Sequence, residues 1–240
     1  MKLAVQLYSV RDGIADGEDM LEALGKVKEI GFDGVEFAGY FGLDAETLAA
    51  RLNQLGLVCI GTHTGLNALK ADALEETIAY HKTIGCKNIG IGGGPHSTIE
   101  ECEATAAILG AAAKVAAKDG IKIYYHNHTE EFTKFENGKT AMEMFAQACS
   151  LEVDTYWSFC AGVDNYKYIT ENKDDIILLH IKDGVDRHPK ALGEGNCDLK
   201  AVIDGAKAAG IDWLVLENDD PEPDGISDIT RSMKYLKANV

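Results

Sequence analysis

The stretch EIGFDGVEF (residues 29–37) holds a helix end, a glycine and the start of a strand in direct succession. Before it, Met20, Leu24 and Val27 recur at helical spacing, and Gly31 is a natural helix stop. The same succession returns in QLGLVCIG (54–61), TIGCKNIGIG (83–92), KDGIKIYY (118–125) and AAGIDWLVLE (208–217). Repeated helix–glycine–strand units predict an α/β fold with parallel strands.

Eight strand-like runs are separated by helix-plus-turn distances: residues 2–9, 34–37, 57–64, 88–93, 121–128, 151–157, 176–183 and 213–219. They predict an α/β fold of the (β/α)8 TIM barrel type, with residues 1–240 as one domain. A doubly wound sheet is the alternative. Its phosphate-binding turn normally carries G-x-G-x-x-G, whereas the first turn here is YSVRDG, and GIGGGP (90–95) imitates that motif only in part.

Composition narrows the function classes. The formal net charge of −16 disfavours nucleic acid as a partner and weakly disfavours a highly phosphorylated substrate. The chain has no apolar run long enough for a membrane span, and its first residues resemble a strand rather than a signal peptide. Six scattered cysteines without a C-x-x-C pair fit a reducing cytoplasm.

Polar residues stand near the ends of almost all these runs. His180 in LLHIKD (178–183) is the clearest case, because a buried imidazole needs a hydrogen-bond partner or a metal ion. The carboxyl ends of barrel strands converge, so the polar residues of different strands should meet there. The set comprises Glu36, His63, His126, Asn127, His128, Glu130, Glu131, Asp154, His180, Lys182, Asp183 and Glu217. Carboxylates with histidine suit a divalent ion such as Mn²⁺, Mg²⁺, Co²⁺ or Zn²⁺.

Seven segments in order carry a resemblance to a known family: VQLYSVRD, GFDGVEFAGY, YHNHTEEF, LEVDTYW, LLHIKDG, LGEGNCDL and WLVLEND. Together they resemble the sugar phosphate isomerase/epimerase family with its xylose isomerase-like barrel. The resemblance implies a divalent metal, Mn²⁺ first, held by Glu131, Asp154, His180 and Glu217. It also implies that Glu131 and Glu217 transfer protons. Glu130 is the alternative to Glu131 as the ligand from the fifth strand.

Further residues are expected at the substrate. Lys182 lies two residues after His180, on the same strand face, and could donate to a substrate oxygen. The other expected contacts are His63, His126, His128, Glu36 and Glu194.

Structural roles compete for several of these residues. Asp154 could cap the next segment, Glu217 could form a salt bridge at the barrel mouth, and Glu194 could order its loop. His81, His96 and His188 are expected at the surface.

The leading hypothesis is a metal-dependent isomerase or epimerase that acts on a keto sugar or polyol ketone through an enediolate. The alternative with the same site is a lyase or dehydratase acting on a 3-oxo-glycoside or an inositol-derived ketone. A DNA-repair endonuclease would need more histidine ligands and a basic surface. A non-catalytic sugar-binding protein, and association of the chain with itself, stay open.

Overall fold

The parallel barrel is closed. A computed structural model describes residues 1–240, and its eight barrel strands pair in the order β1-β10-β7-β6-β5-β4-β3-β2. Their bounds are Lys2–Gln6 (β1), Gly34–Ala38 (β2), Val58–Thr64 (β3), Asn88–Ile91 (β4), Lys122–His126 (β5), Ser150–Asp154 (β6), Ile176–Ile181 (β7) and Trp213–Leu216 (β10). All barrel pairings are parallel, so the predicted TIM barrel is confirmed.

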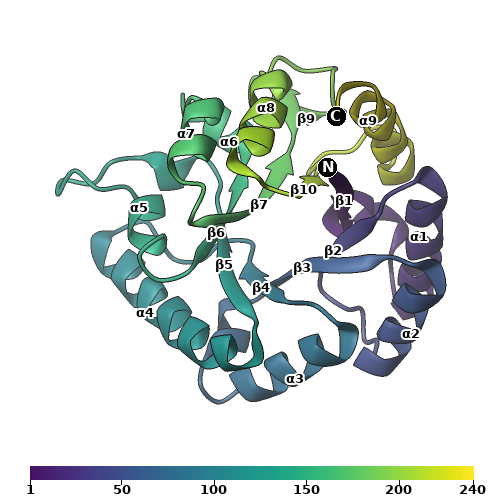
Figure 1. Cartoon of the computed structure of the whole chain (residues 1–240), viewed down its shortest axis with the longest axis horizontal. Helices are drawn as coiled ribbons and strands as arrows, with labels where there is room; N and C mark the ends of the chain where they lie inside the picture. The colour runs from purple at the N-terminus through teal and green to yellow at the C-terminus, as the bar shows by residue number, and fades with distance from the viewer.

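Helices form a ring around these strands (Figure 1). They are Gly17–Ile30 (α1), Ala45–Leu55 (α2), Leu74–Ile84 (α3), Ile99–Ala116 (α4), Ala141–Phe145 (α5), Thr155–Cys160 (α6), Asn165–Glu171 (α7), Leu199–Ala209 (α8) and Gly225–Asn239 (α9). Short 3₁₀ turns span Leu7–Gly13 (η1), Leu66–Leu69 (η2), Ala117–Asp119 (η3) and Glu130–Phe132 (η4). Gly31 ends α1 at φ +111°, a left-handed conformation that favours glycine, as its place in the sequence predicts. None of the helices is long and apolar enough to cross a membrane.

The apolar core has two parts. The larger holds 51 buried residues, including Leu24, Val35 and Leu179, and lies between strands and helices. The smaller, inside the barrel, consists of Ala4, Ile60, Tyr124, Leu178 and Val215. Its side chains fill the barrel below the polar strand ends, so the barrel is a packed support for the site rather than a pore.

Most of the predicted strands run too long, and in two of them the extra residues belong to a helix or a 3₁₀ turn. The first strand ends at Gln6, and residues 7–9 belong to η1; the sixth ends at Asp154, and residues 155–157 begin α6. Both changes occur where a polar side chain accepts a backbone N–H: Gln6 Oε1 from Tyr8, and Asp154 Oδ1 from Tyr156 and Trp157. Such local hydrogen bonds favour a turn or helix start over continued strand.

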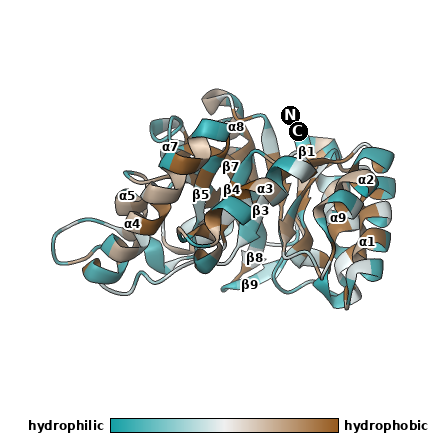
Figure 2. Cartoon of the chain, turned by 90° about the horizontal axis from the view of Figure 1, so that it is seen from below, coloured by the Kyte–Doolittle hydropathy of each residue, from teal (hydrophilic) through white to brown (hydrophobic).

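A hairpin that the sequence did not predict follows the seventh barrel strand. Its strands are Asp183–Val185 (β8) and His188–Lys190 (β9), and they pair antiparallel. It lies at the end of the molecule opposite the two termini (Figure 2). Asp183, the buried first residue of β8, accepts hydrogen bonds from the N–H groups of Gly184, Gly193, Gly195 and Cys197, which orders the LGEGNCD loop.

Candidate metal centre and substrate pocket

Four donor groups from successive barrel strands meet at the carboxyl end. His126 is the last residue of β5, Asp154 the last of β6, His180 lies in β7, and Glu217 directly follows β10. One ligand atom of each lies within 4.8 Å of the others, and all four residues are buried. The strand register contributes, because Asp154 pairs with His180 and His180 pairs with Val215. The predicted convergence of Asp154, His180 and Glu217 therefore occurs.

His180 has partners on both sides of its ring. Nε2 lies 2.6 Å from Oε2 of Glu36, while Nδ1 lies 3.0 Å from Oε2 of Glu217. When Nε2–H donates to Glu36, Nδ1 is free to act as a ligand on the Glu217 side. Glu36 is thus the acceptor that fixes the orientation of this histidine, in place of the direct substrate contact expected from the sequence.

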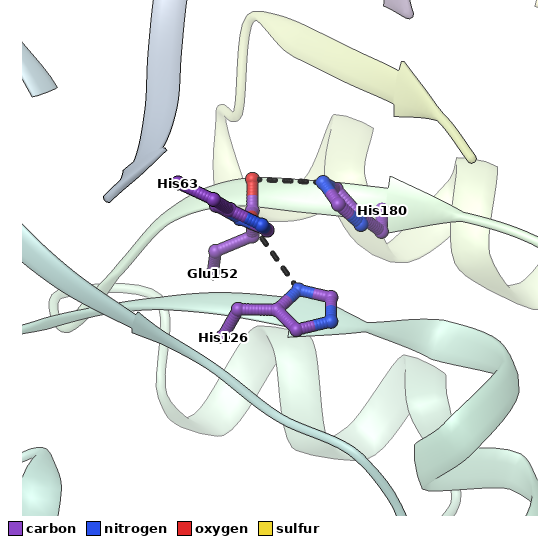
Figure 3. A group of neighbouring side chains, drawn as sticks. All are labelled: His63, His126, Glu152 and His180. Carbon is purple, nitrogen blue, oxygen red and sulfur yellow. Dashed lines mark hydrogen bonds and ion pairs between the residues drawn. The ribbon is translucent and has the colours of Figure 1, made fainter. Parts of the chain in front are cut away.

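A second layer of charge lies immediately below. Glu152 Oε2 lies 2.7 Å from His63 Nε2 and 3.3 Å from His126 Nδ1, and its Oε1 lies 3.2 Å from His180 Nε2 (Figure 3). These four residues form a second close donor group. The sequence analysis missed Glu152. The signal was present, because Glu152 precedes Asp154 by two residues and period two puts both on the inner face of the strand.

The buried carboxylates create a demand for positive charge. Burial alone would lower the pKa of His180, but the carboxylates of Glu152, Glu217 and Glu36 outweigh it and raise the pKa well above its usual value. Two buried atoms, Nδ1 of His126 and Oε1 of Glu152, also lack a partner in hydrogen-bond geometry. A bound cation would offset this negative charge and would compensate for buried nitrogen and oxygen atoms that lack a hydrogen-bond partner. The nitrogen and oxygen donors present therefore fit a divalent metal ion.

Lys182 is fully buried and already paired. Its Nζ lies 3.3 Å from Asp154 Oδ2 and 3.2 Å from Glu217 Oε2, and it also contacts Asp219 Oδ2. The ring of Trp157 lies above it, with Nζ 4.8 Å from the ring centroid. Burial would lower the pKa of Lys182, but Asp154, Glu217 and Asp219 outweigh it and raise that pKa above its usual value. The ammonium therefore orients carboxylates of the site.

Asp154 combines the two roles that the sequence left open. Oδ1 caps α6 by accepting the N–H groups of Tyr156 and Trp157, each at 2.9 Å. Oδ2 points instead to Lys182 and lies 3.9 Å from His180 Nδ1. One oxygen thus fixes the carboxylate while the other stays available to the centre.

A pocket of about 730 Å³ opens above this centre, and we call it the main pocket. Its walls include His63, His126, His128, Trp157, Glu217 and Asp219. Three of the histidines expected at the substrate, His63, His126 and His128, therefore line one cavity. Gly92 and Gly93, after β4, form the adjoining wall.

Glu131 lies outside the close donor group. Its Oε1 accepts from Tyr125 Oη at 3.0 Å, and its Oε2 accepts from the N–H of His128 at 2.9 Å. The strand ends at His126, and Glu131 belongs to the η4 turn, where its side chain is buried. Glu130 is exposed and lies 3.6 Å from Arg187. On the fifth strand, His126 rather than either glutamate contributes to the group.

Two other expectations differ from what the structure shows. Glu194 is exposed and pairs with Arg231 at 2.9 Å, outside the walls of the main pocket. His81, expected at the surface, is buried, with Nε2 2.7 Å from Thr62 Oγ1 and Nδ1 2.7 Å from the carbonyl of Thr77. Helical spacing alone did not reveal that His81 faces the barrel.

The chain matches a known protein family and resembles several solved structures. Residues 24–239 match the family model described as xylose isomerase-like TIM barrel. No curated protein matches the chain in sequence. Among solved structures, a sugar phosphate isomerase/epimerase from Parabacteroides distasonis ATCC 8503 has a TM-score of 0.81 at 20% identity, covering 99% of this chain and 93% of that one.

Two further solved structures of the same fold are named for different activities, one as an epimerase and one as a probable dehydratase. An L-ribulose 3-epimerase has a TM-score of 0.78 at 20% identity and covers 100% of this chain and 94% of its own. A probable 3-DHS dehydratase from Bacillus anthracis has a TM-score of 0.77 at 15% identity and covers 99% of each chain. At these identities the likeness shows a shared fold.

Proposed function

Because the chain belongs to the xylose isomerase-like TIM barrel family, we propose that it is a divalent-metal-dependent isomerase or epimerase acting on a keto sugar. The observation that carries the proposal is the close group of His126, Asp154, His180 and Glu217 at four strand ends. Epimerases among the structural neighbours support the same reaction class.

In this proposal His126, Asp154, His180 and Glu217 hold the metal ion. Two imidazoles and two carboxylates suit Mn²⁺, Co²⁺ or Zn²⁺ better than Mg²⁺, which prefers oxygen donors alone. Mn²⁺ is our first choice. Ligation by Glu131, implied by the sequence resemblance, stays a prediction, and comparing the metal content of Glu131→Gln and His126→Asn would test it.

The bound ion would polarise the substrate carbonyl and stabilise the negative charge that develops on its oxygen. Glu217 is our candidate for the base that removes the neighbouring C–H proton, because its carboxylate lines the main pocket. Burial would raise the pKa of Glu217, but Lys182 and His180 outweigh it and hold that pKa well below its usual range. The carboxylate is therefore ionised at neutral pH.

Epimerisation needs a second group that returns the proton to the opposite face. The sequence resemblance assigns this role to Glu131, and it stays a prediction. One oxygen of Glu131 accepts a hydrogen bond from Tyr125 and the other accepts one from the N–H of His128. Proton return by Glu131 therefore requires the η4 turn to move when substrate binds.

The substrate we propose is uncharged. No lysine or arginine lines the main pocket, and the nearby Lys182 is already paired with carboxylates. A phosphate group would meet the carboxylates of Glu217 and Asp219 instead of a lysine or arginine side chain. His63 and His128, together with the ring of Trp157, offer hydrogen bonds and an apolar face that suit sugar hydroxyls and C–H groups.

Metal content by elemental mass spectrometry is the first test, on wild type, His180→Ala, Glu217→Gln and, as the matched surface control, Glu136→Gln. We expect a stoichiometric transition metal in wild type and the control, and its loss in both site variants while circular dichroism stays native. Solvent deuterium should then enter candidate keto sugars beside the carbonyl only in metal-loaded protein. Wild type that stays metal-free after Mn²⁺ is supplied would refute the proposal.

A second candidate function is elimination, in which proton removal beside a ketone expels a leaving group. The main pocket, at about 730 Å³, has room for a sugar that carries such a leaving group. The structural neighbour named as a probable 3-DHS dehydratase belongs, by that name, to this reaction class. Release of water or an aglycone from the substrate, rather than an epimer, would identify it.

A further inference from the structure

A second cavity of about 390 Å³ adjoins the main pocket, and we call it the side cavity. It lies on the side of β2, β3 and α3, which are neighbours in the ring (Figure 1). Its walls include Tyr40, Ala68, Ala73, Thr77, Tyr80 and His81. The two cavities share His63, Thr64 and Gly65, so one ligand could occupy both.

The polar atoms on the α3 wall of the side cavity are already engaged within the protein. Tyr80 Oη donates to the carbonyl of Leu43 at 2.9 Å. Thr77 Oγ1 donates to the carbonyl of Ala68 at 2.9 Å. These groups therefore have little left to offer a polar ligand, and the wall presents ring faces and methyl groups.

The same holds at the base of the side cavity. Tyr40 Oη lies 3.1 Å from Nε2 of His81, and Thr62 Oγ1 lies 2.7 Å from the same nitrogen. The other ring nitrogen of His81 donates to the carbonyl of Thr77 at 2.7 Å. Each nitrogen has its partner, so His81 acts here as a rigid support for the Tyr40 ring.

Two tyrosines give the side cavity an aromatic wall. The rings of Tyr40 and Tyr80 lie 4.3 Å apart, centroid to centroid. No lysine or arginine lines this cavity, and the exposed carboxylate of Glu76 lies at its edge. An apolar group, aromatic or aliphatic, is therefore the chemistry that this cavity accepts, and an anion is the chemistry that it rejects.

We propose that the substrate has two parts: a carbohydrate that reacts in the main pocket and an apolar aryl or alkyl substituent that occupies the side cavity. The carbohydrate part of this inference rests on the proposed function. His63, Thr64 and Gly65 would contact the junction between the two parts, since they line both cavities. The side cavity would therefore select substituted sugars over free monosaccharides.

Binding of two inert probes tests this inference. Phenyl β-D-glucopyranoside and methyl β-D-glucopyranoside share the sugar and differ in the apolar substituent. Isothermal titration and ligand-observed saturation-transfer NMR on Mn²⁺-treated full-length protein would compare them. We expect the phenyl glycoside to bind at least about tenfold more tightly, because burial of its ring in the side cavity removes apolar surface from water.

Filling the side cavity should remove that preference. Ala68→Leu and Ala73→Leu each add a branched side chain at its wall, whereas Ala79→Leu makes the same change at an exposed position of α3. We expect both filling variants to weaken the phenyl glycoside about tenfold while the methyl glycoside stays unchanged. The Ala79→Leu control should behave as wild type, and melting curves would verify folding.

The result that overturns the inference is equal affinity for the two probes in wild type, or no detectable binding of the phenyl glycoside. A phenyl preference that survives both filling variants overturns it as well. Failure of the proposed function looks different, since it would remove metal binding and deuterium incorporation and leave the phenyl preference intact.

Discussion

Glu152 shows how one buried side chain can organise a centre without lying at a strand end. Its carboxylate lies within 3.3 Å of nitrogens of His63, His126 and His180. Carboxylates that hold the second nitrogen of a metal-binding histidine fix the ring and raise its basicity. Glu152 should therefore control metal affinity even though it lies below the group that we propose as ligands.

We predict that Glu152→Gln weakens Mn²⁺ binding by about 10–100-fold. The amide keeps the volume of the side chain but loses the charge that orients the imidazoles. Competition with a metal-sensitive dye would measure the affinity. Glu143→Gln, on the short helix α5, is a control for the chemical change itself. Unchanged affinity in Glu152→Gln would show that this carboxylate does not act on the ligands.

His81 allows a prediction about pH at a position away from the metal centre. Burial lowers the pKa of His81 to about 4, against 6.5 for a free histidine. Between those values the unfolded chain binds the proton and the folded chain does not. The free energy of unfolding should therefore fall as pH drops from 6.5 towards 4, by about 3 kcal/mol from this residue.

Urea unfolding at several pH values would measure that loss in wild type and in His81→Gln, which has no titrating group at this position. We expect the wild type to lose more stability than the variant over this pH window. His188→Gln, at an exposed histidine, should follow the wild type. Parallel curves for wild type and His81→Gln would contradict the prediction.

At the scale of elements, β4 is the strand whose end carries glycines instead of polar side chains. The reason lies on the neighbouring strand β5, where Tyr124 pairs with Gly90, because a Cβ atom at Gly90 would come within 2.2 Å of the Tyr124 ring. Tyr124 fills the inner core and donates its hydroxyl to Glu36. The absence of a side chain at Gly90 thus makes room for a residue that holds the centre from below.

Gly90→Ala should therefore destabilise the barrel, by about 3 kcal/mol, at the upper end of the cost of overpacking. Chemical unfolding would give the free energy. Gly13→Ala is the matched control, since a Cβ atom there meets nothing within 4 Å. A Gly90→Ala protein as stable as the control would mean that the Tyr124 ring can move aside at little cost.

The sequence predicted the elements better than their ends. Helix–glycine–strand repeats reveal the barrel because they depend on local spacing, and Gly31 and Gly56 stop their helices as predicted. The hairpin β8–β9 escaped because its turn holds Asp186 and Arg187 at positive φ without a glycine, and the loop after it is ordered by Asp183 through N–H groups up to 14 residues away. Such contacts depend on the folded chain and leave no periodic pattern.

For the site, too, the sequence predicted what depends on strand position and missed what depends on contacts in the folded chain. Asp154, His180 and Glu217 could be placed because barrel strands bring their carboxyl ends together. From the sequence, Glu131 and Glu130 were the alternatives for the fifth-strand ligand and His126 was expected at the substrate, because the end of β5 could not be fixed, whereas the structure brings His126 into the close donor group. The strand ends at His126, and the following turn aims Glu131 at Tyr125 instead of the centre.

For the whole molecule, charge is the dominant feature. The chain carries a formal net charge of −16, and several of its carboxylates are buried around Lys182 and the histidines. Like charges held together oppose folding, and a cation that binds the folded state alone offsets that cost. Folding and metal binding should therefore be linked in this protein.

We predict that Mn²⁺ raises the melting temperature of chelator-treated protein. At about 100 times the dissociation constant, binding adds about 2.7 kcal/mol, which corresponds to roughly 5–10 °C for a chain of this size. Differential scanning calorimetry against Mn²⁺ concentration would measure the shift. Ca²⁺ at equal concentration controls for screening of the net charge, because the proposed imidazole ligands disfavour it. A Glu217→Gln variant should lose most of the shift, whereas an equal shift in that variant, or with Ca²⁺, would assign the effect to the general negative surface instead of the centre.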